Sequence, residues 1–168
     1  QPWNENLYKV NENSPKLSKQ RAEEFHTMTA KGLFLSKRAR PDIQPVISFL
    51  CTRTKQPTQE DWQKLTKMMK FLNGTKNDVL TIGADGSHII EWHVDAAFAV
   101  HPDYKSHTGA TMSMGKGAIY SASKKQKVNT RSSTEAEIVA SDDVIGQILW
   151  TRLFLKAQGY PVKENIVY

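Results

Sequence analysis

Residues 92–97 (WHVDAA) and 124–137 (KKQKVNTRSSTEAE) decide the fold that this sequence predicts. The first stretch alternates apolar and polar side chains, which is typical of a strand with one buried face, and it carries Asp95. The second stretch ends in a run of serine and threonine followed by Glu137, which is typical of the first turn of a helix. Two carboxylates that flank a basic segment are the pattern expected of a metal-dependent nuclease.

The basic segment is residues 104–134, which contain no acidic side chain. The formal net charge of the whole chain is +6. The segment holds six basic residues, so the rest of the chain is neutral overall. Positive charge concentrated in one segment indicates a surface that binds a polyanion. The six residues are Lys105, Lys116, Lys124, Lys125, Lys127 and Arg131.

The bulk composition excludes several classes of protein. With 168 residues and 39% hydrophobic residues, the chain is long enough for one ordinary domain or two small ones. No run reaches the roughly 18 apolar residues of a membrane span, and the first residues do not resemble a secretory signal. The single Cys51 rules out an internal disulfide and fits a reducing compartment. We therefore expect a cytoplasmic protein that neither enters a membrane nor is secreted.

The first part of the chain predicts three helices. Ser18 and Thr58 are expected to be N-caps of the first and third helices, and residues 42–54 form the second. Gly74 is expected in the left-handed conformation just past the end of the third helix. Trp62 is expected in the core of this helical unit. The predicted organisation is a polar lead-in, extended or disordered (1–16), a small helical unit (17–75) and an α/β unit (76–168).

From Asp78 onward the hydrophobic period changes to two, which predicts strands. One strand should place Ile90, Trp92 and Val94 on its buried face, with Asp95 on the other face. The expected elements are a hairpin (79–82 with 88–95), a second hairpin (111–114 with 118–123), a helix (133–157) and a strand that begins at residue 165.

The helix start offers two glutamates for one site. Glu135 and Glu137 lie about 200° apart around the axis, so they cannot both face the sheet. Glu137 shares a helical line with apolar Val144, Ile148 and Leu155, so we expect it to point inward. Glu135 follows Ser132 by three residues, which fits a capping box. Thr134 with Glu137 fits the same pattern, so a cap is the alternative role of Glu137, just as Asp95 could cap the loop after its strand.

The other acidic and histidine side chains fit the site less well. Asp142 lies about 140° from Glu137 around the helix, and Asp143 is expected on the solvated surface. A zinc site would need a second cysteine or a short histidine pair on a helix, and the sequence has neither. Metal binding is therefore not expected at His93, His101 and His107.

Six short motifs follow one another along the chain, and together they resemble one family. They are Arg40-Pro41-Asp42-Ile43, Trp62 with Leu72-Asn73-Gly74-Thr75, Val94-Asp95-Ala96, Lys105-Ser106-His107-Thr108-Gly109, Ser123-Lys124-Lys125-Gln126-Lys127 and Ser132-Ser133-Thr134-Glu135-Ala136-Glu137. In this order they resemble the C-terminal part of a copia-type LTR retrotransposon polyprotein. There the tail of the reverse transcriptase leads into a ribonuclease H domain. The resemblance covers nearly the whole chain from about Phe25.

The resemblance implies an α/β fold, an incomplete ribonuclease H-like mixed sheet with a long helix, preceded by the helical reverse-transcriptase tail (connection). Asp95 and Glu137 would be catalytic residues and metal ligands, with two Mg²⁺ ions in the intact parent, which hydrolyses RNA in RNA–DNA hybrids. The third carboxylate of the family follows the next strand in a Tyr-x-Asp type sequence. The chain ends at Tyr168, so we expect the fragment itself to be inactive. The hybrid would contact Lys105, Lys124, Lys125, Lys127 and Arg131.

The expected partners are an RNA–DNA hybrid and the rest of the polyprotein, with its polymerase domain upstream and the remainder of the ribonuclease H domain downstream. A virus-like particle or the nucleus is the alternative to the cytoplasm. Two other functions stay open at this point. One is a non-catalytic nucleic-acid-binding remnant of a decayed element, and the other is a purely structural connection segment.

Overall fold

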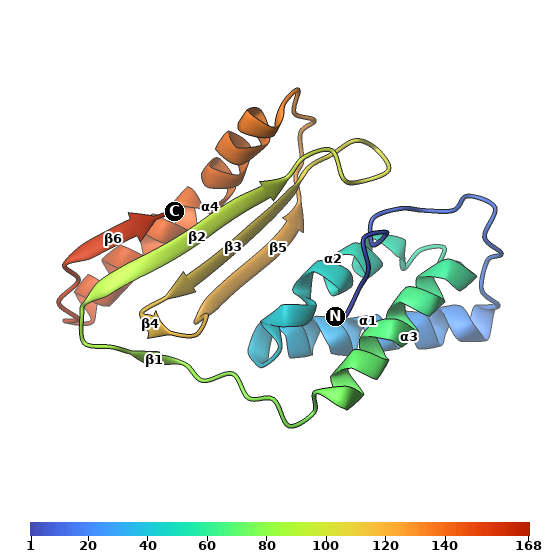
Figure 1. Cartoon of the computed structure of the whole chain (residues 1–168), viewed down its shortest axis with the longest axis horizontal. Coiled ribbons are helices and arrows are strands. Elements are labelled where there is room, and N and C mark those ends of the chain that lie inside the picture. The colour runs from blue at the N-terminus through green and yellow to red at the C-terminus, as the bar shows by residue number, and fades with distance from the viewer. The chain divides into compact units, whose positions relative to one another are not determined.

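The computed structural model describes residues 1–168 and divides into two units, Gln1–Val79 and Leu80–Tyr168 (Figure 1). It contains four α-helices and two sheets. The predicted α/β class is therefore confirmed. The unit boundary falls after Val79, whereas the sequence placed it after residue 75. None of the helices combines the length and the apolar composition needed to cross a membrane.

The first unit consists of α1 (Lys19–Arg38), the short 3₁₀ turn η1 (Pro41–Ile43), α2 (Gln44–Arg53) and α3 (Gln59–Gly74). The two predicted N-caps are confirmed. The Ser18 hydroxyl accepts the N–H of Arg21, and Thr58 forms a capping box with Asp61. Such side-chain oxygens satisfy N–H groups that have no partner in the first turn of a helix.

The start of the chain is packed, so the predicted extended or disordered lead-in needs correction. Leu7 is only 2% exposed and belongs to the same core as Phe25 and Ile47. Tyr8 packs edge-on against Phe49 with ring centroids 5.7 Å apart. A few apolar side chains within a polar stretch are enough to fix it, because burying each one gains about 1.5–3 kcal/mol.

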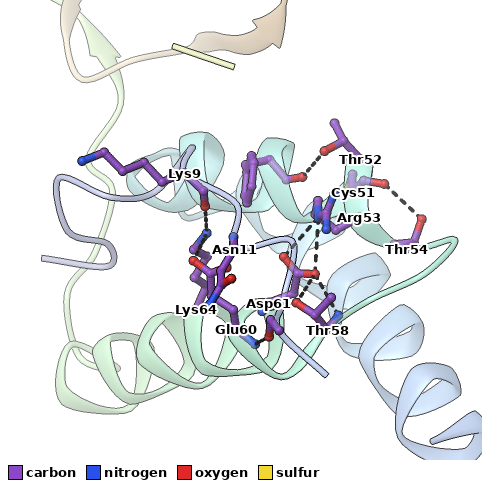
Figure 2. A network of polar contacts seen from close by, with 12 residues as sticks. Lys9, Asn11, Cys51, Thr52, Arg53, Thr54, Thr58, Glu60, Asp61 and Lys64 are labelled. Carbon is purple, nitrogen blue, oxygen red and sulfur yellow. Dashed lines mark hydrogen bonds and ion pairs between the residues drawn. The ribbon is translucent and has the colours of Figure 1, made fainter. Parts of the chain in front are cut away.

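Polar contacts hold this segment to α3, and Figure 2 shows them at close range. The N–H of Asn11 donates to a carboxylate oxygen of Glu60 over 2.7 Å. Glu60 also forms an ion pair with Lys64, whose ammonium contacts the backbone oxygen of Lys9. The next residue along α3, Asp61, joins Thr58 and Arg53 in a separate buried cluster.

The end of α3 differs from the prediction. Gly74 is the last helical residue and does not adopt the left-handed conformation, and Thr75 is the C-cap with φ −117°. The guanidinium of Arg40 donates to the backbone oxygen of Thr75 over 3.1 Å and to its hydroxyl over 2.6 Å. Because a distant arginine binds the helix end, no left-handed glycine is required there.

The second unit contains a four-stranded sheet and one long helix (Figure 1). The strand order is β5-β3-β2-β6, and β6 runs parallel to β2 while the other pairs are antiparallel. The predicted long helix is confirmed as α4. The elements are β1 (Gly83–Ala84), β2 (Ile89–Ala97), β3 (His107–Ser113), β4 (Gly115–Lys116), β5 (Tyr120–Lys125), α4 (Ser133–Ala157) and β6 (Glu164–Val167).

The first predicted hairpin is wrong. Residues 79–82 form no strand, and the short β1 that follows pairs with β4 in a separate two-stranded sheet. Gly117 explains why this segment passes over the β4 turn. Its φ is +65°, and a Cβ at this position would lie 2.2 Å from the backbone oxygen of Thr81. Only glycine accommodates both the conformation and the close approach.

The core of the second unit lies between one face of the sheet and α4. Ile90 and Trp92 are completely buried, and Val94 packs against the same cluster, which confirms the predicted face of β2. Val144 and Ile148 of α4 complete the cluster. The opposite face of the sheet is left to carry polar side chains, among them Asp95.

Candidate functional site

Asp95 lies near the end of β2, the strand between β3 and β6. It is exposed, and one of its carboxylate oxygens accepts the N–H of Ala96 over 2.8 Å. Directly across on β3 is Gly109, where an added Cβ would have only the backbone oxygen of Asp95 near it, 3.9 Å away. The absent side chain leaves open space beside the carboxylate. One oxygen of Asp95 therefore accepts the N–H of the next residue within β2 and does not cap the loop after the strand, and no bond is recorded for the other oxygen.

Glu137 is the fifth residue of α4, and its side chain is exposed and does not point inward as predicted. The inward line at this end of the helix starts with Ala136 and Ala140, both completely buried. These alanines therefore occupy the side of the helix start that is buried, and the neighbouring Glu137 is exposed. The Ser132 cap is confirmed, since its hydroxyl accepts the N–H of Glu135 over 3.1 Å. The carboxylate of Glu135 accepts the N–H of Arg131 over 2.7 Å.

Metal binding by the chain would rest on these two exposed carboxylates. Nowhere in the chain do three or more histidine, cysteine, aspartate or glutamate side chains come together to hold a metal ion. Carboxylate oxygens are the ligand type that Mg²⁺ prefers, and Asp95 and Glu137 both have oxygens open to solvent. Each carboxylate could therefore supply an oxygen ligand to a magnesium ion from its own place in the unit, with further ligands from elsewhere.

The five basic residues predicted to bind nucleic acid differ in their surroundings. Lys124 forms an ion pair with Asp143 at 3.3 Å, and Lys125 forms one with Asp103 at 2.6 Å. Lys105 is half-buried, while Lys127 and Arg131 are exposed. Of the five, Lys127 and Arg131 are therefore the exposed basic side chains without a recorded ion pair.

Asp143 and Gln126 join α4 to the sheet, and the sequence did not reveal this role. Asp143 accepts the hydroxyl of Thr108 over 2.9 Å, so its expected solvated position is wrong. The Gln126 side chain is 1% exposed and donates to Thr108 over 3.1 Å and to the backbone oxygen of Ala136 over 2.9 Å. Gln126 thereby fixes the residue that precedes Glu137. A lone glutamine within a lysine run carries no local signal for such a contact.

His101 and His107 form a buried chain of polar groups with Ser123. Their facing ring nitrogens, Nε2 of His101 and Nδ1 of His107, are 3.0 Å apart. Nε2 of His107 lies 2.7 Å from the Ser123 hydroxyl. The chain of groups connects the loop after β2 to β3 and β5. These contacts account for the burial of both imidazole rings.

Comparisons with known proteins place these features in a wider context. The chain is 33% identical over 130 residues to the retrovirus-related Pol polyprotein from transposon TNT 1-94 of Nicotiana tabacum, which covers 77% of this chain and 10% of that polyprotein. It is 32% identical over 112 residues to the corresponding polyprotein from transposon RE1 of Arabidopsis thaliana, which covers 66% of this chain and 8% of the relative. The chain is similar to a part of retrotransposon Pol polyproteins.

These relatives support a retrotransposon polyprotein as the source of the chain. The chain spans a tenth or less of the length of either relative. An uncharacterized mitochondrial protein of Arabidopsis thaliana is also similar, with 27% identity over 113 residues, or 67% of this chain and 47% of that protein. No family model and no solved structure matches the chain.

Within this polyprotein segment the buried histidines predict a dependence of stability on pH. Burial lowers the pKa of His101 to about 4, with nearby Lys125 adding to the effect and Asp103 opposing it. Burial, together with His101, lowers the pKa of His107 to about 4. Their ordinary value is 6.5, so below that pH the unfolded chain binds more protons than the folded chain. Stability should be fully present above the ordinary value and should fall as the pH drops toward 4.

Urea unfolding followed by circular dichroism at several pH values would measure this loss. We expect His107→Gln to flatten the pH dependence between the two pKa values, although it lowers stability at neutral pH. The matched control is His26→Gln, because His26 is exposed on α1 and should leave the pH dependence unchanged. An equal slope in the wild type and in His107→Gln would show that the buried histidines do not cause the loss.

Proposed function

We propose that the chain is a fragment of a copia-type polyprotein in which the tail of the reverse transcriptase leads into a ribonuclease H-like domain. The parent would hydrolyse RNA in RNA–DNA hybrids. The observation that carries the proposal is the placement of two carboxylates. Asp95 lies near the end of an inner strand, and Glu137 is the fifth residue of the helix that packs against that strand.

Each unit has a role in this proposal. The three helices of Gln1–Val79 would be the reverse-transcriptase tail, and Arg40 and Thr75 belong to two of the motifs that carry the resemblance. The unit Leu80–Tyr168 would be the ribonuclease H-like part. Its mixed sheet with one long helix is the type of fold that the resemblance implies.

Asp95 and Glu137 would serve as metal ligands, and each has a distinct support. Gly109 leaves space beside the Asp95 carboxylate, and Gln126 holds the backbone just before Glu137. Two Mg²⁺ ions bound in the intact parent would activate the attacking water and stabilise the leaving oxygen. Since no third ligand is assembled within the chain, we expect little or no cleavage by the 168 residues alone.

The direct test is cleavage of a labelled RNA–DNA hybrid in Mg²⁺ by this chain and by a form extended along the reading frame of its parent. We expect the extended form to cleave and its Asp95→Asn and Glu137→Gln variants to lose at least about a hundredfold in rate, because each removes a ligand and a negative charge at the metal. Glu135→Gln is the matched control, since Glu135 binds the backbone of Arg131. Undiminished cleavage by the Asp95→Asn form would sink the assignment.

A second candidate function is binding of nucleic acid without catalysis, as in a decayed element. It is favoured by the exposed position of the Glu137 side chain, which does not point inward, and by the exposed Lys127 and Arg131. This function requires hybrid binding that does not depend on Mg²⁺ or on Glu137→Gln. If charge reversal at these basic residues left binding intact, a purely structural connection segment would be the better description.

Hybrid binding should depend unequally on the basic residues. Replacing both Lys127 and Arg131 with alanine should lower the slope of log affinity against log salt by roughly 1 for each phosphate that the protein no longer neutralises. Lys124→Ala should change it less, because Lys124 is already paired with Asp143. Lys163→Ala is the control, since Lys163 is exposed in the same unit but outside the basic segment. Fluorescence anisotropy with a labelled hybrid at several salt concentrations measures the slopes. Equal slopes for the wild type and the three variants would contradict the proposed nucleic-acid interface.

A further inference from the structure

A buried group of polar side chains connects β3, the residue after β5 and the start of α4. Thr108 of β3 is completely buried and lies at its centre. The Thr108 hydroxyl donates to the carboxylate of Asp143 over 2.9 Å and accepts a side-chain N–H of Gln126 over 3.1 Å. The same nitrogen of Gln126 also donates to the backbone oxygen of Ala136 over 2.9 Å. Thr108, Gln126 and Asp143 are called the polar cluster here.

The donors and acceptors of the polar cluster fix the direction of each bond. A backbone carbonyl only accepts, so the nitrogen and not the oxygen of the Gln126 amide must face Ala136. The Thr108 hydroxyl therefore receives an N–H from Gln126 and gives its own proton to Asp143. The backbone N–H of Gln126 donates to the backbone oxygen of Ser106 over 2.9 Å, so this residue is held by its backbone as well. The polar cluster thus allows one arrangement of its side chains.

Stability alone does not account for the glutamine in the polar cluster. The side-chain oxygen of Gln126 is buried without a hydrogen-bond partner. A buried acceptor of this kind costs about 1–3 kcal/mol, which apolar packing would avoid. What the amide adds is the direction of its two N–H bonds. A polar group that fixes geometry at a cost in stability is typical of the residues that support a functional site.

The polar cluster holds α4 at two points, one on each side of Glu137. Gln126 binds the backbone of Ala136, the residue before Glu137. Thr108 binds Asp143, which follows Glu137 along the helix. Ala136 and Asp143 are seven residues apart, which is close to two full helical turns, so both lie on the same side of the helix. Two bonds along one side fix the rotation of the helix start about its axis.

Thr108 also lies beside the strand that carries Asp95. It faces Ala96 across the β2–β3 ladder, and Ala96 donates its N–H to the Asp95 carboxylate. We propose that Thr108 is a positioning residue of the candidate site, which sets the placement of Glu137 on α4 relative to Asp95 on β2. Because Thr108 is completely buried, it acts through the strand and the helix and does not itself contact metal or substrate. The inference rests on the proposed function, in which the two carboxylates bind Mg²⁺.

Nuclear magnetic resonance of the 168-residue chain tests the geometry without any need for activity. Residual dipolar couplings report the direction of the backbone N–H bonds at the start of α4 relative to those in β2. Thr108→Val keeps the shape of threonine and removes the hydroxyl, so we expect the couplings of residues 136–143 to change together relative to those of β2. Thr108→Ser keeps the hydroxyl and should keep the wild-type couplings. Thr111→Val is the matched control, because Thr111 is exposed on the same strand.

Unchanged couplings in Thr108→Val, or an equal change in Thr108→Ser, would overturn the positioning role. If circular dichroism showed that Thr108→Val does not fold, Gln126→Met would take its place, since methionine fills a similar volume without the amide that binds Ala136. The same change in the couplings is expected of this variant, and unchanged couplings would again contradict the proposal.

Cleavage of a labelled RNA–DNA hybrid by the extended form tests the consequence for the site. We expect Thr108→Val to lower kcat by about 10–100-fold, the effect typical of residues that support metal ligands, and to leave KM for the hybrid within about twofold. Thr108→Ser should recover most of the rate, and Thr111→Val should keep all of it. A raised KM at normal kcat, or no loss of rate, would overturn the inference. An extended wild type that does not cleave would refute the proposed function, whereas the dipolar couplings would still decide whether Thr108 sets the helix start.

Discussion

Asp61→Ala should lower the free energy of unfolding of the unit Gln1–Val79 by about 3–5 kcal/mol, because it breaks a buried ion pair and leaves one partner alone. The Asp61 side chain is 1% exposed and lies 3.2 Å from the Arg53 guanidinium. Its second oxygen accepts the N–H of Thr58 over 2.9 Å and the Thr58 hydroxyl over 3.0 Å (Figure 2). The Asp61 carboxylate therefore takes part in the capping box of α3 and also pairs with the positive charge of Arg53, the last residue of α2.

The size of this effect follows from what the variant leaves behind. Alanine cannot accept the N–H of Thr58, so the capping box of α3 keeps only one of its two bonds, and a lost hydrogen bond of this kind costs about 1 kcal/mol. The guanidinium of Arg53, whose side chain is 25% exposed, would also lose its counter-charge. Asp61→Asn should cost less than Asp61→Ala, since the amide oxygen can still accept the N–H of Thr58.

Urea unfolding with hydrogen exchange read by mass spectrometry would follow this unit separately from the other. Glu60→Gln is the matched control, since Glu60 is the neighbouring acidic residue and forms a partly exposed ion pair with Lys64 at 3.1 Å. The control should cost about 1 kcal/mol or less. A loss for Asp61→Ala no larger than that of the control would contradict the role of the buried pair.

The elements predicted correctly from the sequence are those whose signals lie within a few neighbouring residues. Ser18, Thr58 and Ser132 accept N–H groups three residues ahead, so each cap is visible in a window of four residues. The alternation in β2 is equally local, and it places Ile90 and Trp92 in the core. Local chemistry thus accounts for most of the helices and for the buried face of β2.

The errors arise where a distant residue decides the structure. Residues 79–82 are apolar and β-branched as in a strand, but the segment that follows them pairs with β4 beside the glycine turn at 115–117. Gly74 ends a helix without turning left-handed, because Arg40 binds the C-cap residue Thr75 from 35 residues away. Neither partner can be found by inspecting the segment itself.

In the candidate site, too, features set by neighbouring residues could be predicted, and features set by distant residues could not. The elements that carry Asp95 and Glu137 could be predicted, and the direction of the Glu137 side chain could not. The periodic line through Val144 and Ile148 ignores alanine, whereas Ala136 and Ala140 set which side of the helix start meets the sheet. Gln126 holds that start through a contact across 10 residues of chain. Hydrophobic periodicity therefore identifies the helix, but it does not fix the rotation of the helix about its axis at the N-terminal end, where Glu137 lies.

The second large effect is expected for Trp92→Ala, which should lower the free energy of unfolding of the unit Leu80–Tyr168 by about 3–5 kcal/mol. Trp92 is completely buried in the cluster that contains Met112 and Val144, and its ring lies 5.5 Å from that of Tyr120. Removing it leaves a cavity between the sheet and α4 that a rigid sheet cannot fill by collapse. Since domains are typically stable by only about 5–15 kcal/mol, a substantial part of the unit's stability depends on this one ring.

Comparison with Trp92→Phe separates ring volume from the polar N–H group. The indole N–H of Trp92 is buried without a hydrogen-bond partner, so phenylalanine removes an unsatisfied donor while keeping much of the packing. We expect Trp92→Phe to cost far less than Trp92→Ala, and Phe98→Ala, at a residue that is 41% exposed in the same unit, to cost about 1 kcal/mol or less. β2 also carries Asp95, so the candidate site requires the folded sheet. Hybrid binding should therefore be lost where Trp92→Ala unfolds the unit, and it should persist in Trp92→Phe. Equal losses of stability in the two variants would show that the volume kept by phenylalanine makes no difference, and they would contradict the role assigned to the packing of the ring.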